Sequence, residues 1–508
     1  MRLVLLTTVA TALVALPAAA GSARTPDAVV VRLTEADANL VLRGAFRAKG
    51  GPVFAGRRDR VSRGVHGLSY EVRLSEPVLA LGRNGTAALT FDILEADVTI
   101  ARIERKILGQ RARCEGAGLF IEPGHPLALA LDLGFVVEEG DVRVVPIEAR
   151  SPGAREAIHL VKPERCRNTV LPKWLLWGLG KSHLKRHVAQ VDRLLLKRAK
   201  DAAAGLAEDG LVREEWEIGS TRFRLDASRI ETDDGALTVA FDGFGEAGAG
   251  GSVDEGQPQA VPPVLPVGES AVAVSERLVN VAIGAAFEGL GERARRPAGD
   301  FRRLVRSDAV LALVPGLRNL ETREGLLFRM RLDAPPRVRF RELALWEVGP
   351  TPAIEREPPP TTARAVVEIE IENVALDVMR ATTGAEPEHL GTLTIETGLV
   401  RAVPFVNRIG GIAFEPLENS WRLSATGIDF DEPLLAATIQ ELVFGALFET
   451  RFEPIAPGGW RVGDAQLAPR AISVIEGYLV ITLGDAAPPP DSIVDASATR
   501  TDTLRVSR

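Results

Sequence analysis

Two stretches of the chain share one order of apolar and polar positions. In residues 31–50 an apolar strand end leads into Thr34, an amphipathic segment and a glycine. Residues 272–291 repeat this order 241 residues later, with Ser275 in the place of Thr34. A Ser or Thr N-cap before an amphipathic segment, with glycine after it, is typical of a helix. The pattern therefore predicts two helices that open two copies of a duplicated domain.

After each of these stretches, apolar and polar residues alternate. Such period-2 runs, separated by Gly, Asn and Pro, predict antiparallel strands with one buried face. The hairpin that ends the first copy, around Asp233–Gly235, also returns near Gly477. In the first half the strand runs are 68–74, 89–93, 127–133, 142–145, 216–225 and 230–241, and in the second half they are 326–332, 338–346 and 366–378.

Two further segments have helical spacing. Residues 181–206 carry apolar side chains on one face and cations on the other. Asp431 and Pro433 indicate the start of a second apolar-faced helix, expected over residues 431–447. The cationic face is either solvated or in contact with anionic lipid headgroups, and the sequence favours neither. The headgroup candidates on it are Lys181, Lys185, Arg186, Arg193 and Lys197.

The chain divides into five parts. A positive residue, an apolar run and Ala18-Ala19-Ala20 predict a signal peptide over residues 1–20, and hence a periplasmic or secreted protein. Domains are expected at 27–243 and 269–485, joined by a Gly/Pro-rich linker at 244–268 and followed by an unpacked tail at 486–508. In an exported chain Cys114 and Cys166 favour one disulfide over two free buried thiols.

Composition and motifs exclude several classes of function. The formal net charge of −7 argues against a nucleic-acid partner. The GxGxxG match at Gly243–Gly248 is followed by more Gly and then Pro, so it lacks the helix that a dinucleotide site needs. His183 and His187 lie among cations, which disfavours a metal. No nucleophile-and-base signature is visible. We therefore expect no enzyme activity, no cofactor and no metal.

Several short segments carry a resemblance to a known family. Val29–Thr34, Val272–Asn280 and Leu311–Pro315, followed by Ala334-Pro335-Pro336, resemble segments of the tubular lipid-binding superfamily, which includes bactericidal/permeability-increasing, lipopolysaccharide-binding and lipid-transfer proteins. The resemblance implies an α+β fold of two tandem duplicated domains, elongated overall. Each domain would be a highly twisted, barrel-like antiparallel sheet wrapped around a long helix. It also implies one disulfide in the first domain.

The function expected from this resemblance is non-catalytic lipid binding or transport in the cell envelope. The ligand would be a phospholipid, a fatty acid or a lipopolysaccharide-like lipid, with peripheral membrane contact as a further expectation. The alternatives are an envelope scaffold or adhesion protein with packed domains, and an exported hydrolase. The apolar pocket candidates are Val41, Leu42, Ala45, Phe46, Leu184, Val188, Val191, Leu195, Ala282, Ile283, Ala286 and Phe287.

One row of arginines is expected to face solvent and not to bind a ligand. Arg337, Arg339 and Arg341 alternate with Val338 and Phe340. This alternation predicts a strand whose arginines face solvent, which is more common than a binding site.

Overall fold

The structure is a computed structural model, which describes the two halves of the chain with gaps. The described residues are 22–48, 53–62, 65–107, 110–167, 193, 196–197, 200, 214–218, 221–233, 235–246, 263–291, 295–297, 326–332, 335–344, 363–380, 386–406, 411–417, 420–427, 460–462 and 465–485.

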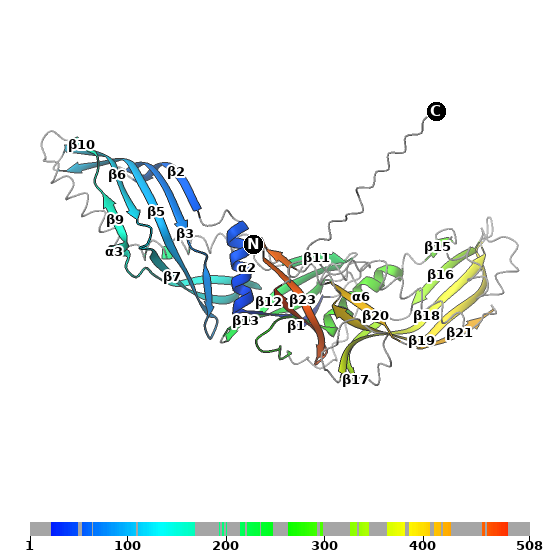
Figure 1. Ribbon diagram of the computed structural model, residues 1–508. Helices are drawn as coiled ribbons and strands as arrows, with labels where there is room; N and C mark the ends of the chain where they lie inside the picture. The colour runs from blue at the N-terminus through cyan, green and yellow to red at the C-terminus, as the bar shows by residue number, and fades with distance from the viewer. Residues whose placement is uncertain are drawn as a thin grey trace, which may run out of the picture.

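An eight-stranded antiparallel sheet forms the centre of the molecule (Figure 1). Both halves of the chain contribute to it, because β1 of the first half pairs with β14 of the second, from Val29 opposite Val274 to Arg32 opposite Ala271. Its strands in spatial order are β11 (Glu214–Ile218), β12 (Thr221–Asp233), β13 (Ala236–Glu246), β1 (Ser22–Thr34), β14 (Ser270–Ser275), β24 (Tyr478–Asp485), β23 (Ala465–Ile475) and β22 (Trp460–Val462).

A nine-stranded sheet from the first half lies at one end of the molecule. The short helix α3 (Ala154–Ala157) follows β8 and packs against this sheet. The strands are β2 (Val53–Ser62), β3 (Val65–Leu74), β4 (Val78–Leu81), β5 (Thr86–Ile107), β6 (Gln110–Ile121), β7 (Leu127–Glu138), β8 (Asp141–Arg150), β9 (Ile158–Val161) and β10 (Arg165–Arg167).

A seven-stranded sheet from the second half lies at the opposite end, so the molecule is elongated (Figure 1). Its long strands β18 and β19 pair along most of their length. The strands are β15 (Arg295–Pro297), β16 (Leu326–Leu332), β17 (Arg337–Ala344), β18 (Ala363–Arg380), β19 (Glu388–Val406), β20 (Ile412–Pro416) and β21 (Ser420–Thr426).

The two predicted opening helices are present, with the predicted caps. Helix α2 spans Glu35–Ala48, and the Oγ1 atom of Thr34 accepts a hydrogen bond from the amide of Asp37 at 3.2 Å. Helix α6 spans Glu276–Gly291, and Ser275 Oγ accepts one from the amide of Leu278 at 3.1 Å. Each cap satisfies one of the free amides at a helix start, which fixes where the strand ends and the helix begins.

The main core lies on one face of the central sheet and includes residues from both halves. Val29, Phe241, Val272, Leu467 and Ile481 are each at most 4% exposed and belong to one packed cluster. One partly buried valine of each helix, Val41 in α2 and Val279 in α6, packs against this cluster. The shared core and the β1–β14 pairing join the two halves, while the predicted domain boundary at 244–268 stays a prediction.

The predicted fold class is wrong. The sheets do not wrap around a long helix: they are open, and α2 and α6, of 14 and 16 residues, lie against strands on one side. Only Ala38, Asn39 and Gly44 of α2 are buried. A helix enclosed by a sheet would instead be apolar and buried on every side. In its described part the protein is mostly β, with long strands carrying the architecture.

The alternation of residues in β7 is confirmed. Leu127, Leu129, Leu131 and Leu133 are buried, at 2% to 9% exposure, and the residues between them are more exposed. The helix expected at 181–206 lies mostly outside the described residues. Of its described positions, Leu196 packs against Leu131, Leu133 and Ala149 of β7 and β8, so this part of the chain does contact the nine-stranded sheet.

Several other predictions lie outside the described residues: the signal peptide at 1–20, the helix at 431–447 and the tail at 486–508. The predicted disulfide, by contrast, lies within the described residues. Cys114 on β6 is bonded to Cys166 on β10, at directly opposite positions of two paired strands. The bridge thus joins neighbouring strands of the nine-stranded sheet.

Candidate functional site

Helix α2 covers the free edge of strand β4 with two side chains. The amide nitrogen of Asn39 donates to the carbonyl of Leu79 at 2.7 Å, and the amide oxygen of Asn39 accepts from the Leu79 N–H, also at 2.7 Å. The carboxylate of Glu35 accepts a hydrogen bond from the Leu81 N–H at 2.8 Å. The other edge of β4 pairs with β5, so these contacts satisfy the edge that faces the helix.

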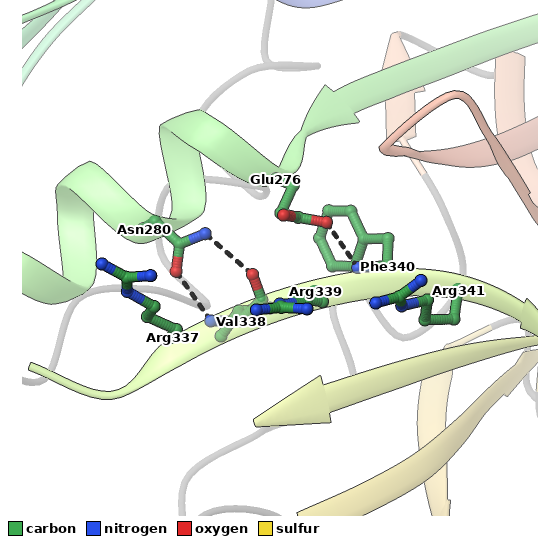
Figure 2. A pocket seen from close by; sticks show the side chains of 7 residues that line it. All are labelled: Glu276, Asn280, Arg337, Val338, Arg339, Phe340 and Arg341. Carbon is green, nitrogen blue, oxygen red and sulfur yellow. Dashed lines mark hydrogen bonds between the residues drawn. The ribbon is translucent and has the colours of Figure 1, made fainter. Parts of the chain in front are cut away.

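Helix α6 covers strand β17 in the same way, as Figure 2 shows. The side-chain amide of Asn280 binds both the carbonyl and the N–H of Val338, each at 2.7 Å. Glu276 accepts from the Phe340 N–H at 2.8 Å. Unpaired strand edges invite pairing with other chains, and these helices block two such edges.

A hollow of about 340 Å³ lies beside this second junction (Figure 2). Arg337, Arg339 and Arg341 line it together with Glu276 and Asn280. The prediction of a strand with arginines on its outer face is confirmed, because Val338 and Phe340 are buried at 4% and 7% exposure while the arginines alternate with them. The hollow itself was not predicted, since it depends on where α6 packs.

Acidic residues of β18 pair with two of these arginines. Arg339 lies 3.1 Å from Glu370, and Arg341 lies 3.5 Å from Glu368. Glu368, which is 6% exposed, also accepts from Arg401 of β19 at 2.9 Å. Among the described residues no ion pair joins Arg337.

The surroundings of the Glu276 carboxyl group change its pKa in opposite directions. Burial raises the pKa of Glu276 above its ordinary value, and this effect outweighs the Phe340 N–H and the charges of Arg339 and Arg341, which act to lower it. Its proton affinity is therefore higher than that of a carboxyl in water. The junction combines a row of cations with one partly desolvated acid.

The apolar pocket candidates lie on both helices, where the structure describes them. Val41, Leu42, Ala45 and Phe46 of α2 are half-buried, and Ala282 of α6 is buried. Ile283 packs against the cluster of Val338, Phe340 and Val367. Val41 packs against the shared core of the central sheet, whereas Ile283 packs beside β17, so each of these two candidates contacts a different packed cluster. The side chains of Leu184, Val188, Val191, Leu195, Ala286 and Phe287 lie outside the described residues.

Of the headgroup candidates, only two are described. Arg193 and Lys197 are exposed helical residues, on either side of Leu196 in the sequence. Leu196 contacts the sheet, so this short part of the predicted helix has one apolar contact face and exposed cations. Lys181, Lys185 and Arg186 lie outside the described residues.

One face of the nine-stranded sheet is apolar across several strands. The strand register places Tyr70 of β3 opposite Val98 of β5, and Val98 opposite Leu119 of β6. A second row joins Leu68, Ile100 and Ala117 in the same order. Tyr70, Val98 and Leu119 are only half-buried, whereas their neighbours in sequence such as Thr99 are exposed on the opposite face.

Closer to α3 the same face is packed. The next row, Val72, Ala96 and Ile121, belongs to a cluster that also contains Ala154 and Ala157 of α3. The apolar face thus includes the packed core near α3, then the half-buried row of Tyr70, Val98 and Leu119. In the row beyond it Ile100 and Ala117 are buried again, at 7% and 1% exposure. Sequence alternation indicated β3 at 68–74 and the first part of β5 at 89–93, but not β6. Only the strand register shows that the apolar residues of the three strands form continuous rows.

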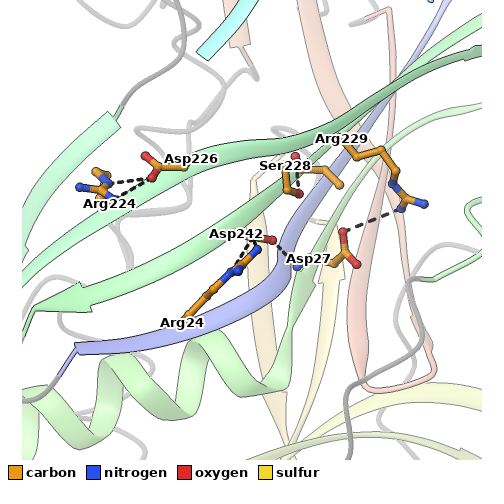
Figure 3. A network of polar contacts seen from close by, with 8 residues as sticks. Arg24, Asp27, Arg224, Asp226, Ser228, Arg229 and Asp242 are labelled. Atoms are coloured by element: carbon orange, nitrogen blue, oxygen red, sulfur yellow. Dashed lines mark hydrogen bonds and ion pairs between the residues drawn. The ribbon is translucent and has the colours of Figure 1, made fainter. Parts of the chain in front are cut away.

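A polar network crosses the middle of the central sheet (Figure 3). Asp242 is 4% exposed, accepts from Arg24 at 2.6 Å and accepts from the Asp27 N–H at 3.0 Å. Asp27 in turn lies 3.8 Å from Arg229, and its carbonyl accepts from the hydroxyl of Tyr478 at 3.1 Å. These contacts link β1, β12, β13 and β24 and explain buried charges without a ligand.

Tyr478 is completely buried. Burial, with the nearby charge of Asp27, raises the pKa of Tyr478 to about 12. Its neutral hydroxyl therefore donates to the Asp27 carbonyl throughout the ordinary pH range.

One group of side chains has the residue types of a hydrolase. His389 Nε2 lies 2.9 Å from Thr392 Oγ1, and Thr392 donates to Asp377 at 2.8 Å. A catalytic triad places the imidazole between the nucleophile and the acid. Here the threonine lies in the middle, so the geometry does not match that arrangement. No group of three metal-ligating side chains occurs among the residues that the structure describes.

Comparisons with known proteins give matches at the level of structure. No family model and no curated protein matches the sequence. One similar solved structure is a lipopolysaccharide binding protein, at 14% identity and a TM-score of 0.38, covering 91% of this chain and 99% of that one. A second is P47 from Clostridium botulinum A2, at 9% identity and a TM-score of 0.22, covering 90% of this chain and 97% of that one. In the described residues, no helix has the length and apolar character to span a membrane.

Sequence reasoning missed the role of the two repeated acids and asparagines. The amphipathic pattern assigns no contact to Asn39 and Asn280, but they bind the edges of β4 and β17. Glu35 and Glu276 coincide when the two stretches are aligned, and so do the asparagines. A polar residue that recurs at the same place in two copies was the available signal for a shared contact.

Proposed function

We propose that this protein is a non-catalytic lipid-binding protein of the cell envelope, exported to the periplasm or beyond. The observation that carries the proposal is the apolar face of the nine-stranded sheet, where Tyr70, Val98 and Leu119 form a half-buried row. Acyl chains would lie along such rows, since each buried methylene contributes about 0.8 kcal/mol. The bound lipid would be a phospholipid, a fatty acid or a lipopolysaccharide-like lipid.

Two further features support this assignment. The predicted signal peptide accounts for a location where lipids are moved between membranes. The sequence resemblance to the tubular lipid-binding superfamily, stated above, points to the same class of ligand. The cations of the helix that carries Arg193 and Lys197 are proposed as headgroup contacts, because both are exposed beside a residue that contacts the sheet.

The direct test is native mass spectrometry and organic extraction of protein purified from cells. We expect a copurifying lipid, and uptake of a fluorescent fatty acid by the delipidated protein. Absence of both would contradict lipid binding and favour a packed scaffold.

A pair of variants locates the binding face. Val98→Gln places an amide on the apolar face, whereas Thr99→Gln places the same group on the opposite, exposed face. Burying an unpaired amide against an acyl chain costs about 1 to 3 kcal/mol, so Val98→Gln should weaken fatty-acid binding about five- to a hundred-fold. Thr99→Gln should bind as the unaltered protein does. Equal binding by both variants, with unchanged thermal unfolding, would place the lipid elsewhere.

A further inference from the structure

The hollow between α6 and β17 is chemically different from the apolar face. It lies in the other half of the chain, and three of the residues that line it are arginines of one strand. Alternate residues of a strand lie about 6.6 Å apart on the same face, so Arg337, Arg339 and Arg341 form a row of guanidinium groups. In Figure 2 all three side chains lie along the strand, Arg337 and Arg339 beside the first turns of α6 and Arg341 beyond the start of the helix.

Together with Arg401, the row gives four cations against the three acids Glu276, Glu368 and Glu370, which is a positive excess of one. Glu370 pairs with Arg339, and the partner of Arg341, Glu368, is shared with Arg401. Arg337 has no ion pair within the described part of the chain. Glu276 is the acid on the helix side of the hollow, and its carboxylate already accepts from the Phe340 N–H. An anion in the hollow would therefore bind Arg337 first.

We propose that this hollow binds a phosphate monoester through Arg337, with Arg339 as the second contact. A guanidinium presents its N–H groups as a planar fork that matches phosphate oxygens. A phosphate has three terminal oxygens, so two neighbouring arginines of the row bind it at once, whereas a carboxylate fills one fork. The hollow, at about 340 Å³, also has room for the glycerol or sugar that carries the phosphate.

The first half of the chain supplies a natural control. Leu79 and Leu81 of β4 take the places of Val338 and Phe340, because Asn39 and Glu35 bind them as Asn280 and Glu276 bind β17. The outward positions of β4 are then Val78, Ala80 and the following Gly82, in place of the three arginines. The first junction therefore lacks the cations, and the proposed site belongs to the second junction alone.

The test is calorimetric titration of the full chain with glycerol 3-phosphate, and separately with dihexanoyl phosphatidic acid below its micelle concentration. Arg337→Gln should weaken binding at least about tenfold, because a charge-assisted bidentate contact is lost. Arg337→Lys keeps the charge without the fork and should lose less. Arg422→Gln removes an equal charge from an exposed position of β21 in the same sheet and should change nothing.

Glu276→Gln gives a change in the opposite direction. The glutamine oxygen still accepts from the Phe340 N–H, but the negative charge beside the hollow is gone, so phosphate binding should tighten. Loss with Arg337→Gln and gain with Glu276→Gln is a pattern that general destabilisation does not produce.

The two probes separate the possible sources of the phosphate. Glycerol 3-phosphate binding that is as tight as that of the phosphatidic acid, or tighter, identifies a site for a soluble phosphate ester. Tighter binding of the phosphatidic acid identifies a lipid headgroup. Either result supports the site if Arg337→Gln weakens the binding at least about tenfold. No binding of either probe, or binding that Arg337→Gln leaves unchanged, overturns the proposal. This outcome is independent of the comparison of Val98→Gln with Thr99→Gln, which concerns the other half of the chain.

Discussion

The two helix–strand junctions have the same hydrogen bonds and different outer surfaces. At α2 and at α6, one asparagine and one glutamate bind the free edge of a strand, with distances of 2.7 to 2.8 Å at both. The outward residues differ completely: Val78 and Ala80 are exposed on β4, where Arg337 and Arg339 stand on β17. The contacts that hold the helix are therefore separate from the side chains that face solvent, and only the latter differ in chemistry.

The largest expected effect comes from removing the shared asparagines. Asn39→Ala and Asn280→Ala each leave one backbone N–H and one carbonyl of a covered strand edge without a partner. Two unsatisfied groups cost about 2 to 4 kcal/mol in the free energy of unfolding, measured by urea denaturation. A much smaller cost at one junction would show that the two are not equivalent in energy. Exposed Thr99→Ala serves as the control, with an expected effect near zero.

A second effect is specific to one copy. In the paired hairpins Tyr478 lies opposite Ser275, whereas Ala236 takes the equivalent place opposite Thr34. The folded-state pKa of Tyr478 is raised from 10 to about 12, so the protein should lose up to about 3 kcal/mol of stability as pH rises through this interval. The sign follows because the unfolded chain gives up this proton first.

The check is to measure unfolding free energy at pH 9 to 12 for the unaltered protein and Tyr478→Phe. The variant should lose about 1 kcal/mol at pH 9, where the hydrogen bond to Asp27 is missing, and should fall less steeply above pH 10. Parallel curves for the two proteins would rule out Tyr478 as the source.

A third prediction concerns arginines introduced at the first junction. Val78→Arg combined with Ala80→Arg places two cations on the outer face of β4, which is already held by the same contacts as β17. In a protein that also carries Arg337→Gln, the altered first junction should bind phosphate about tenfold more tightly than the protein with Arg337→Gln alone. Calorimetry with glycerol 3-phosphate measures it. No gain would show that the shape of the second hollow matters as much as its charge.

The smallest expected effect concerns the helix caps. Thr34→Ala and Ser275→Ala each remove one hydrogen bond to a first-turn amide, at 3.2 and 3.1 Å, and each should cost about 1 kcal/mol in unfolding free energy. Ser and Thr are interchangeable caps, so Thr34→Ser and Ser275→Thr should retain most of this unfolding free energy. If either alanine substitution leaves the unfolding free energy unchanged, packing alone fixes the start of that helix.

Local structure could be predicted from the sequence, and long-range structure could not. Thr34 and Ser275 indicated both helix starts, and the alternation at Leu127–Leu133 indicated a half-buried strand, because caps and periodicity depend on near neighbours. The wrapped-helix fold came from the resemblance and is wrong. Which strands pair across the chain, as β1 does with β14, depends on contacts that leave no periodic signal.

At the candidate site, too, the local structure could be predicted from the sequence and the long-range contacts could not. The alternation of Arg337 to Arg341 predicted a strand with an exposed charged face, and this is confirmed. The hollow beside it arises only because Glu276 and Asn280 bring α6 against that strand. The repeat of Glu and Asn in two stretches held this information, but their shared role became visible only with the partner strands in place.

The shared central sheet has a consequence for how the chain folds and how it can be divided. Val31 of β1 pairs with Val239 of β13, so β1 can pair only after about 200 further residues have been synthesised. Contacts of such high sequence separation are slow to form. A chain cut between β13 and β14 would give two fragments, one with the apolar edge of β1 exposed and the other with that of β14. We expect these fragments to associate when mixed and to restore the cooperative unfolding of the intact protein.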